Sequence, residues 1–170
     1  VVLGSGTALT GALKAAAEGM SVIVLEKASL IGGTTKYSGG QVWVPCNDYS
    51  ENADDRTLAK TYMTKVASGL STEAIIDAYL DNASDMVNFI ADQAGVVWSV
   101  SPRIDYHAQW EGASRDTRSL SPVIDGVRSG SHFIEPEGES LQALGGTILT
   151  ETAAKRLVAR PLENGAQEIL

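Results

Sequence analysis

The apolar and glycine positions at the start of the chain predict a strand, a helix and a second strand. Val1–Leu3 is a short apolar run and Ser21–Leu25 is a longer β-branched one, while Thr7–Glu18 between them is rich in alanine. Apolar residues in that middle segment recur at spacings of three and four, as one face of a helix requires. Gly19 follows at a position where glycine commonly ends a helix. Because both strands are continuously apolar, we expect them to be buried, with the second covered on both faces.

Farther along the chain, helical periods alternate with irregular stretches. Asp54–Ala67 and Thr72–Ala94 each carry apolar residues on one face and predict two helices, the second with a possible interruption at Ser84-Asp85 and an end at Gly95. The other expected segments are an ordered glycine-rich loop over Ile31–Asn47, a strand over Val96–Val100, a mostly irregular stretch over Ser101–Glu139, a helix over Thr147–Arg160 and a strand over Gly165–Leu170. The chain thus divides into residues 1–50 (βαβ unit and glycine-rich loop), 51–100 (helical), 101–139 (irregular) and 140–170 (a helix and the start of a further strand).

Composition narrows the class of protein. The chain has 170 residues, of which 44% are apolar and 20% charged, as is typical of one globular domain. A formal net charge of −8 and the lack of a Lys/Arg cluster disfavour a nucleic-acid partner. The single cysteine, Cys46, and two separated histidines, His107 and His132, do not make a metal-binding pattern.

The ends of the chain and its hydropathy bear on location and completeness. No apolar run approaches the roughly 20 residues that span a bilayer, and no signal-peptide pattern is visible, so we expect a cytoplasmic protein without a transmembrane segment. The chain has no initial methionine and stops inside an expected strand. We therefore expect a fragment, and the sequence predicts no particular oligomeric state.

Gly4-Ser5-Gly6 lies between the first strand and the helix, and Glu26 follows the second strand. A helix N-terminus attracts anions, so this turn suits a pyrophosphate. Gly4 permits a tight turn, Gly6 lacks a Cβ that would block phosphates, and Glu26 can accept hydrogen bonds from ribose hydroxyls. Leu9 replaces the third glycine of the usual G-x-G-x-x-G and should push the helix outward unless small neighbours accommodate it. The group predicts a dinucleotide site, the alternative being an ordinary strand–helix turn with a solvated Glu26.

A second glycine cluster follows closely, Gly32-Gly33-Thr34-Thr35 and then Ser38-Gly39-Gly40. A nicotinamide-binding fold normally has a plain helix here. A flavin requires more contact, because the chain must also approach the ribityl chain and the isoalloxazine edge. Glycines allow that approach, and Thr and Ser hydroxyls can bond phosphate and ribityl oxygens. The alternative, a flexible surface loop, does not explain the apolar and aromatic run Gln41–Pro45, so the cluster favours a flavin.

These motifs resemble those of a known family. Gly-Ser-Gly, Val-Leu-Glu-Lys and the stretch Gly33–Asn47, which ends in Trp-Val-Pro-Cys-Asn, are similar to the 3-ketosteroid dehydrogenase branch of the fumarate reductase/succinate dehydrogenase flavoproteins. The resemblance implies FAD and an incomplete α/β, Rossmann-like FAD/NAD(P)-binding βαβ fold, with a parallel sheet and flanking helices. It makes residues 1–170 the N-terminal part of an FAD-binding domain, without the substrate or cap domain. The residues that would line FAD are Gly4, Ser5, Gly6, Glu26, Lys27, Gly33, Thr34, Thr35, Ser38, Gly39 and Gly40.

Tyr106 is the catalytic candidate. Asp105-Tyr106 follows Pro102 in the irregular stretch, and the ketosteroid dehydrogenases have an Asp-Tyr pair at a similar distance behind their helical segment. The resemblance implies that Tyr106 lines a substrate cleft over the flavin and supports a second tyrosine that removes a proton, a role that suits a phenol. The alternative is a tyrosine that packs an irregular loop. The following are interpreted as packing or solvated residues: Tyr49, Trp98, His107, Trp110, Arg115 and Arg118.

By resemblance, the reaction is an FAD-dependent oxidation of a CH–CH group in a small steroid-like ketone. A base takes a proton beside the carbonyl, a hydride passes to flavin N5, and an external acceptor then takes the electrons. We expect the fragment alone to be inactive, because the remaining catalytic groups would lie beyond Leu170. The alternatives are a fumarate reductase/succinate dehydrogenase-type flavoprotein and, from another class, a non-catalytic flavin-binding module or an inactive truncated product. The second glycine cluster disfavours an NAD-dependent dehydrogenase.

Overall fold

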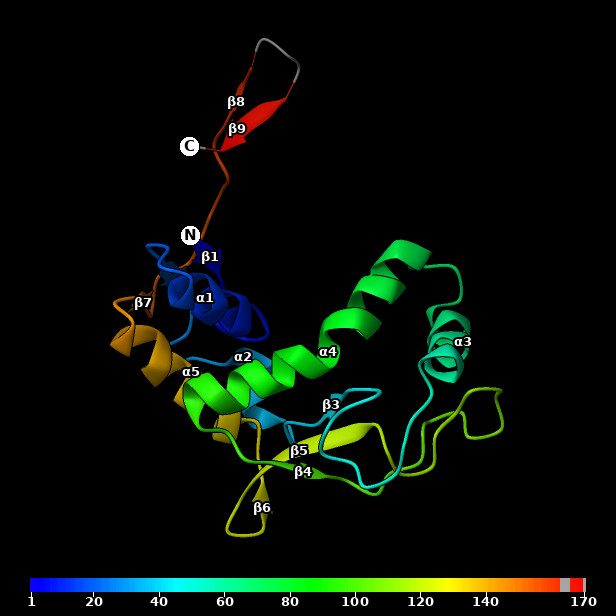
Figure 1. Ribbon diagram of the computed structural model, residues 1–170. Coiled ribbons are helices and arrows are strands. Elements are labelled where there is room, and N and C mark those ends of the chain that lie inside the picture. The colour runs from blue at the N-terminus through cyan, green and yellow to red at the C-terminus, as the bar shows by residue number, and fades with distance from the viewer. Residues whose placement is uncertain (163–165, 170) are drawn as a thin grey trace.

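The computed structural model describes residues 1–162 and 166–169 and contains two larger sheets with helices packed around them (Figure 1). The helices are α1 (Ala8–Ala17), α2 (Gly33–Tyr37), α3 (Arg56–Ala67), α4 (Glu73–Ala94) and α5 (Ser131–Ala143). The strands are β1 (Val2–Leu3), β2 (Ile23–Leu25), β3 (Val42–Trp43), β4 (Trp98–Val100), β5 (Ser119–Ile124), β6 (Val127–Arg128), β7 (Thr147–Leu149), β8 (Ala159–Pro161) and β9 (Gln167–Ile169). Among the described helices, none has the length and apolar character needed to cross a membrane.

The parallel sheet has the strand order β1-β2-β7, with α1 as the crossover from β1 to β2. The predicted βαβ unit and the α/β Rossmann-like fold class are therefore confirmed. Leu9 is fully buried in the core, so the helix accommodates it. Val24 is buried as expected, but Leu3 is 48% exposed and Ile23 is 42% exposed. Val1 is 84% exposed as well. The prediction of burial is wrong for these three side chains, because within the described residues the sheet is covered by α1 and α5, which pack against each other and leave the rest of its surface open.

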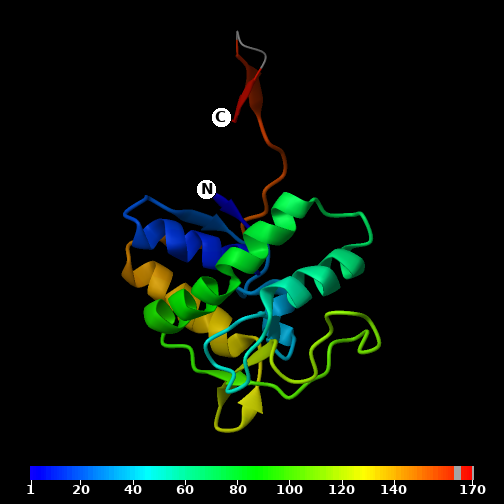
Figure 2. The ribbon, with the colours of Figure 1, turned by 45° about the vertical axis from the view of Figure 1, so that its right-hand side comes forward.

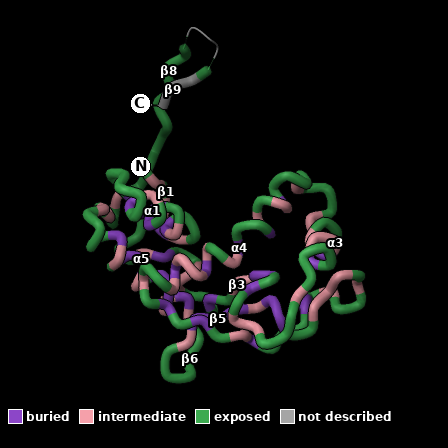
Figure 3. The backbone as a smooth tube through the Cα atoms, viewed as in Figure 1, coloured by how far each residue is buried: buried purple, intermediate pink, exposed green. Residues whose placement is uncertain are grey.

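The second sheet is antiparallel, with the order β3-β5-β4 and β6 paired to β5. Helix α5 connects the two sheets, because it packs against α1 and α4 and also contacts β5 and β7. Its side chains Phe133, Ile134 and Leu141 join Leu9 and Leu13 of α1 in the main core. Figure 3 shows the buried positions gathered where α1, α5, β3 and β5 meet. The glycine-rich segment between β2 and β3 therefore runs between two sheets that α5 holds together.

Both helices predicted in the middle of the chain are present. Asp55 caps α3 by accepting hydrogen bonds from the N–H groups of Thr57 and Leu58, and Gly95, with φ of +67°, ends α4. Helix α4 continues through Ser84-Asp85 without a break. The suggested interruption is wrong because the apolar face of α4 stays buried on both sides of that pair.

Several other expected elements are wrong. The glycine-rich loop contains α2 and β3, and the stretch expected to be irregular contains β5, β6 and most of α5. Pro136 and Gly138 lower the helix propensity of α5, yet its tertiary contacts prevail. A Cβ on Gly138 would lie 2.6 Å from Cδ1 of Ile31, so a larger residue there would require the Ile31 side chain to shift.

The helix expected over residues 147–160 is also wrong. Thr147–Leu149 is β7, which pairs in parallel with β2, and extended chain then leads to β8. The strand expected over Gly165–Leu170 is present as β9, with Gly165 and Leu170 themselves outside the described residues. Strand β9 pairs antiparallel with β8 and is not a further strand of the parallel sheet. The β8–β9 hairpin stands apart from the rest of the molecule in both views (Figures 1 and 2).

Candidate functional site

A pocket of about 320 Å³ lies where β1 and β2 end. The carboxyl ends of parallel strands are where open α/β sheets commonly bind ligands. Six of the residues that the sequence assigned to the cofactor meet in this pocket, from the first turn, the end of β2 and the start of α2. The lining residues are Leu3, Gly4, Ser5, Gly6, Leu25, Glu26, Lys27, Gly33, Ala153 and Ala154.

Ser5 and Glu26 form the hydrogen-bonded centre of this pocket. The N–H and the hydroxyl of Ser5 donate to Oε2 of Glu26 at 3.0 and 2.5 Å, and the N–H of Ala28 donates to Oε1 at 2.9 Å. The Ser5 hydroxyl also accepts a hydrogen bond from the N–H of Gly32 at 2.9 Å. These bonds, that of the Ser5 hydroxyl first, hold the pKa of Glu26 below its usual value. One serine thus joins the first glycine turn, the end of β2 and the second glycine cluster.

The N-terminus of α1 has the donors and the charge that suit an anionic group. Thr7 forms no side-chain cap, and the first turn contains no acidic residue. The first N–H groups of a helix have no intrahelical partner, so they can donate to an acceptor placed there. A Cβ on Gly6 would lie 3.6 Å from the carbonyl oxygen of Gly32 and 3.7 Å from Oγ1 of Thr35. The two glycine clusters are therefore in contact at this helix end.

The glycines of the second cluster differ in their surroundings. A Cβ on Gly33 or Gly39 would meet no atom within 4 Å, whereas a Cβ on Gly40 would lie 2.8 Å from Cα of Gly130. The Ser38 hydroxyl donates to the carbonyl of Thr35 at 2.8 Å and accepts from the N–H of Gly40 at 2.9 Å. Gly40 and Ser38 thus shape the loop itself, while Gly33 and Gly39 leave open space.

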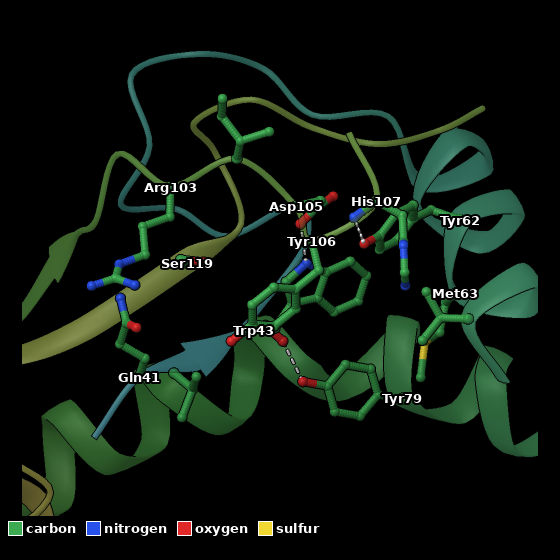
Figure 4. A pocket seen from close by; sticks show the side chains of 13 residues that line it. Gln41, Trp43, Tyr62, Met63, Tyr79, Arg103, Asp105, Tyr106, His107 and Ser119 are labelled. Atoms are coloured by element: carbon green, nitrogen blue, oxygen red, sulfur yellow. Dashed lines mark hydrogen bonds between the residues drawn. The ribbon is translucent and has the colours of Figure 1, made fainter. Parts of the chain in front are cut away.

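A larger pocket, of about 750 Å³, begins where the glycine-rich segment ends (Figure 4). Trp43 lies at its centre, with its ring stacked near that of Tyr79 (centroids 6.4 Å apart) and tilted against that of Tyr62 (6.1 Å). The Tyr79 hydroxyl donates to the carbonyl oxygen of Trp43. The lining residues are Gln41, Val42, Trp43, Tyr62, Met63, Val66, Tyr79, Arg103, Ile104, Asp105, Tyr106, His107 and Ser119.

A buried ion-pair network lies beneath this pocket. Arg118 is 2% exposed and donates to Asp54 through Nε and Nη2, each at 2.8 Å, and to Asp105 through Nη1 at 3.1 Å. Burial by itself raises the pKa of Asp54, but the hydrogen bonds and charge of Arg118 outweigh burial and leave that pKa below its usual value. The expectation of a solvated Arg118 is therefore wrong, because the fold brings it between two carboxylates that are distant from each other in sequence.

Asp105 connects this network to the segment that carries Tyr106. Its Oδ1 accepts from Nε1 of Trp43 at 2.7 Å, and its Oδ2 accepts from the N–H of Ser114 at 2.8 Å as well as from Arg118. Both carboxylate oxygens are thus engaged, and the backbone at residue 105 is fixed against β3. Tyr106, the next residue, is 98% exposed and lines the pocket.

Comparison with known proteins identifies the family of this chain. Residues 1–168 match the family described as the FAD binding domain. The chain belongs to this family. Its cofactor is FAD, and the flavin site expected from the two glycine clusters agrees with this family.

Curated relatives of this FAD-binding chain oxidise ring ketones, as their names state. The chain is 36% identical over 132 residues to the 4-oxocyclohexanecarboxylate 2-dehydrogenase of Sinomonas cyclohexanicum. It is 33% identical over 128 residues to the 3-oxosteroid 1-dehydrogenase of Comamonas testosteroni. These matches cover 75% and 72% of this chain but only 23% and 22% of the relatives, so the chain spans under a quarter of their length.

Solved structures agree in fold. The 3-ketosteroid Δ1-dehydrogenase from Sterolibacterium denitrificans, in complex with 1,4-androstadiene-3,17-dione, superposes on 99% of this chain with a TM-score of 0.85 at 21% identity. The 3-ketosteroid Δ4-(5α)-dehydrogenase from Rhodococcus jostii RHA1 gives a TM-score of 0.78 at 22% identity. The chain covers 45% and 42% of these two structures. At this identity the likeness supports the fold assignment alone.

The residues of the smaller pocket suit the chemistry of FAD. An uncapped helix N-terminus can receive a pyrophosphate, an ionised Glu26 can accept from hydroxyl groups, and open space at Gly33 allows close approach of a ligand. The remaining FAD candidates do not line this pocket. They lie on the segment that leads from the smaller pocket to the larger one: Thr34, Thr35, Ser38, Gly39 and Gly40.

Sequence reasoning missed part of both pockets. Ala153 and Ala154 line the smaller one, but their segment was expected to be helical. Tyr62, Tyr79 and Arg103 line the larger one. Both tyrosines lie on helix faces that the sequence predicted to be apolar. A tyrosine carries a hydroxyl as well as a ring, so its presence on such a face was the signal available for a pocket residue.

Proposed function

We propose that this chain is the flavin-binding part of an FAD-dependent dehydrogenase that oxidises a CH–CH group beside the carbonyl of a 3-ketosteroid-like ring ketone. The observation that carries the proposal is the aromatic pocket that begins where the glycine-rich segment ends and that Tyr106 lines. Relatives that are at least 33% identical act on ring ketones, by their names. An external electron acceptor and a cytoplasmic location stay predictions.

The residues proposed to hold FAD run from one pocket toward the other. Gly4, Ser5 and Gly6 would hold the pyrophosphate at the start of α1, with Glu26 and Lys27 near the adenosine end. The remaining FAD-lining candidates would continue toward the flavin ring: Gly33, Thr34, Thr35, Ser38, Gly39 and Gly40. Open space at Gly33 and Gly39 supports this path. The hydroxyl of Ser38 is used within the loop, so we propose that Ser38 acts by shaping the loop.

The proposed reaction removes a proton and a hydride from adjacent carbons and leaves a conjugated enone. Bound FAD supplies the electron sink for the hydride. In our proposal Tyr106 supports removal of the proton, because its phenol can share a proton with a neighbouring base. Trp43, Tyr62 and Tyr79 would pack against the apolar body of the substrate and exclude water. Asp105 would keep Tyr106 in place through the bonds of its carboxylate to Trp43, Ser114 and Arg118.

The test is a Tyr106→Phe exchange in the natural-length protein that contains this chain. Released flavin should be FAD, in equal amount in both proteins. Turnover of a 3-ketosteroid should fall by about 100-fold, the lower end of the usual contribution of an acid–base group. Tyr49→Phe, outside the pocket, is the matched control and should keep full turnover. Full turnover in Tyr106→Phe would contradict the proposed role of Tyr106, and a folded wild type without FAD would contradict the flavin site.

We also propose that residues 1–170 alone do not turn over substrate, because this chain spans under a quarter of the length of its relatives. Dye reduction by the isolated chain with a 3-ketosteroid would overturn this statement. A fumarate reductase-type activity would appear instead as turnover of a small dicarboxylate, and a non-catalytic module as FAD binding with no turnover in the natural-length protein.

A further inference from the structure

The charges around the larger pocket are unequally distributed. Asp105 is the carboxylate among its lining residues, and both of its oxygens are occupied by Trp43, Ser114 and Arg118. Arg118 in turn forms ion pairs with both Asp54 and Asp105, so its guanidinium is fully engaged by carboxylates. Arg103 also lines the pocket, and within residues 1–162 and 166–169 its guanidinium forms no ion pair. Arg103 thus offers the pocket a guanidinium that no carboxylate of the described residues engages, although the chain as a whole has a formal charge of −8.

The polar and aromatic side chains also lie at different ends of the pocket. In Figure 4, Arg103 and Gln41 lie together at one end, Tyr62 and Met63 at the other, and Trp43 between them. The Gln41 amide donates to the hydroxyl of Ser101 at 3.0 Å, and this bond holds the amide beside Arg103. A ligand that lies along the pocket thus meets a cationic end and an aromatic end.

From this arrangement we infer that the substrate of the larger pocket carries a carboxylate, which Arg103 binds. The inference rests on the proposed ring-ketone function and narrows its substrate class from neutral steroids to ring ketones with an acidic substituent. A guanidinium matches a carboxylate with two parallel N–H···O bonds, which fixes orientation as well as position. Bound in this way, the ring lies against Trp43, Tyr62 and Tyr79, and its carbonyl side faces the segment that carries Tyr106.

A neutral ring ketone uses the same aromatic wall without the ion pair. The pocket should therefore bind both kinds of ligand but prefer the acid, and the preference should depend on Arg103. Because Arg103 is exposed, salt should weaken the preference. This dependence separates a charge-based preference from one based on ring size or shape.

The experiment measures binding by calorimetry to the FAD-loaded, natural-length protein, with 4-oxocyclohexanecarboxylate and its methyl ester as probes. We expect the acid to bind roughly tenfold more tightly than the ester, and Arg103→Gln to remove that difference while leaving the affinity for the ester unchanged. Arg103→Lys should restore part of it. Arg115→Gln is the matched control, because Arg115 is an exposed arginine on the same loop that does not line the pocket.

Each outcome bears on one of the two proposals. Equal affinity of the wild type for acid and ester, or an unchanged affinity of Arg103→Gln for the acid, would overturn the carboxylate site and leave the ring-ketone function standing. An equal loss of acid affinity in Arg115→Gln would also overturn it, because the effect would then come from net charge. If the wild type bound none of the three ligands (the acid, the ester and a neutral ketosteroid), the ring-ketone function would be overturned together with the carboxylate site.

Discussion

Glu137 is a fully buried carboxyl on α5 that faces α1. Its Oε1 accepts a hydrogen bond from the Thr10 hydroxyl at 2.7 Å, and its Oε2 has no hydrogen-bond partner among the described residues. Burial raises the pKa of Glu137 to about 7. The protonated form therefore suits the folded chain better than the ionised form does, since a buried carboxylate with a single hydrogen bond is costly.

The raised pKa of Glu137 predicts a pH-dependent stability. The folded pKa of about 7 lies above the ordinary value of 4.5, so the folded state holds a proton that the unfolded state releases between these two values. The stabilisation is complete below pH 4.5 and is lost as the pH rises through 7. We expect the free energy of unfolding to fall by roughly 3 kcal/mol over this range from Glu137 alone. Urea unfolding of wild type and Glu137→Gln at several pH values measures this loss.

Glu139→Gln provides the control for that experiment, because Glu139 is an exposed carboxyl on the same helix. It should keep the wild-type pH dependence, whereas Glu137→Gln should lose most of it. A Glu137→Gln curve parallel to that of the wild type between pH 4.5 and 7 would show that Glu137 is ionised in the folded chain.

Single residues of the candidate site differ in how far the sequence predicted them. Ser5 and Glu26 could be predicted, because each follows directly after a strand and the βαβ geometry brings these positions together. The burial of Arg118 and of Glu137 could not be predicted. Their partners, Asp54 and Thr10, are distant in sequence, and no local pattern indicates which distant groups the fold will pair.

At the scale of elements, the contact between the glycine-rich segment and α5 decides where the two pockets lie. Gly40 has φ of +68°, and a Cβ there would lie 2.8 Å from both Cα of Gly130 and Cγ of Pro122. The N–H of Gly130 donates to the carbonyl of Ser38 at 2.9 Å. The start of α5 and β5 are thus packed directly on the loop proposed to approach the flavin.

Gly40→Ala should therefore destabilise the chain. The left-handed backbone and the two close contacts together should lower the free energy of unfolding by roughly 2–4 kcal/mol. Gly39→Ala is the matched control, because a Cβ on Gly39 meets no atom within 4 Å. It should change stability by less than about 1 kcal/mol and, if Gly39 lines FAD, weaken FAD binding. Urea unfolding and flavin titration separate the two effects, and equal stability of both variants would refute the packing role of Gly40.

Elements with a strong local period were predicted well, and those fixed by distant contacts were not. Helices α1, α3 and α4 show apolar spacing and termini in the sequence, and the structure contains all three. Helix α5 carries Pro136 and Gly138, which locally disfavour a helix, and forms because it packs between α1, α4 and both sheets. Strand β7 was mistaken for a helix because its pairing with β2 spans more than a hundred residues and leaves no local signal.

At the scale of the whole molecule, the chain consists of a packed body and a hairpin that stands apart from it. Residues 150–158 connect β7 to β8 as mostly exposed, irregular chain, and Ala153 and Ala154 on this connection line the smaller pocket. The connection therefore lies against the site proposed for FAD. Occupation of that site should be detectable in the behaviour of the connection as well as in a flavin spectrum.

Limited trypsin digestion tests this coupling. Lys155 and Arg156 follow the two pocket alanines and are exposed, so trypsin should cut there early in the chain without FAD. FAD bound against Ala153 and Ala154 should hold the connection in place and slow that cleavage at least roughly tenfold at saturation. Arg128, exposed on β6 at the opposite end of the body from the hairpin, is the internal control, and its cleavage rate should not change (Figure 1).

If bound FAD left the rate at Lys155 and Arg156 unchanged, the connection would not be part of the cofactor site. If FAD slowed cleavage at Arg128 equally, the effect would be a general stabilisation of the fold.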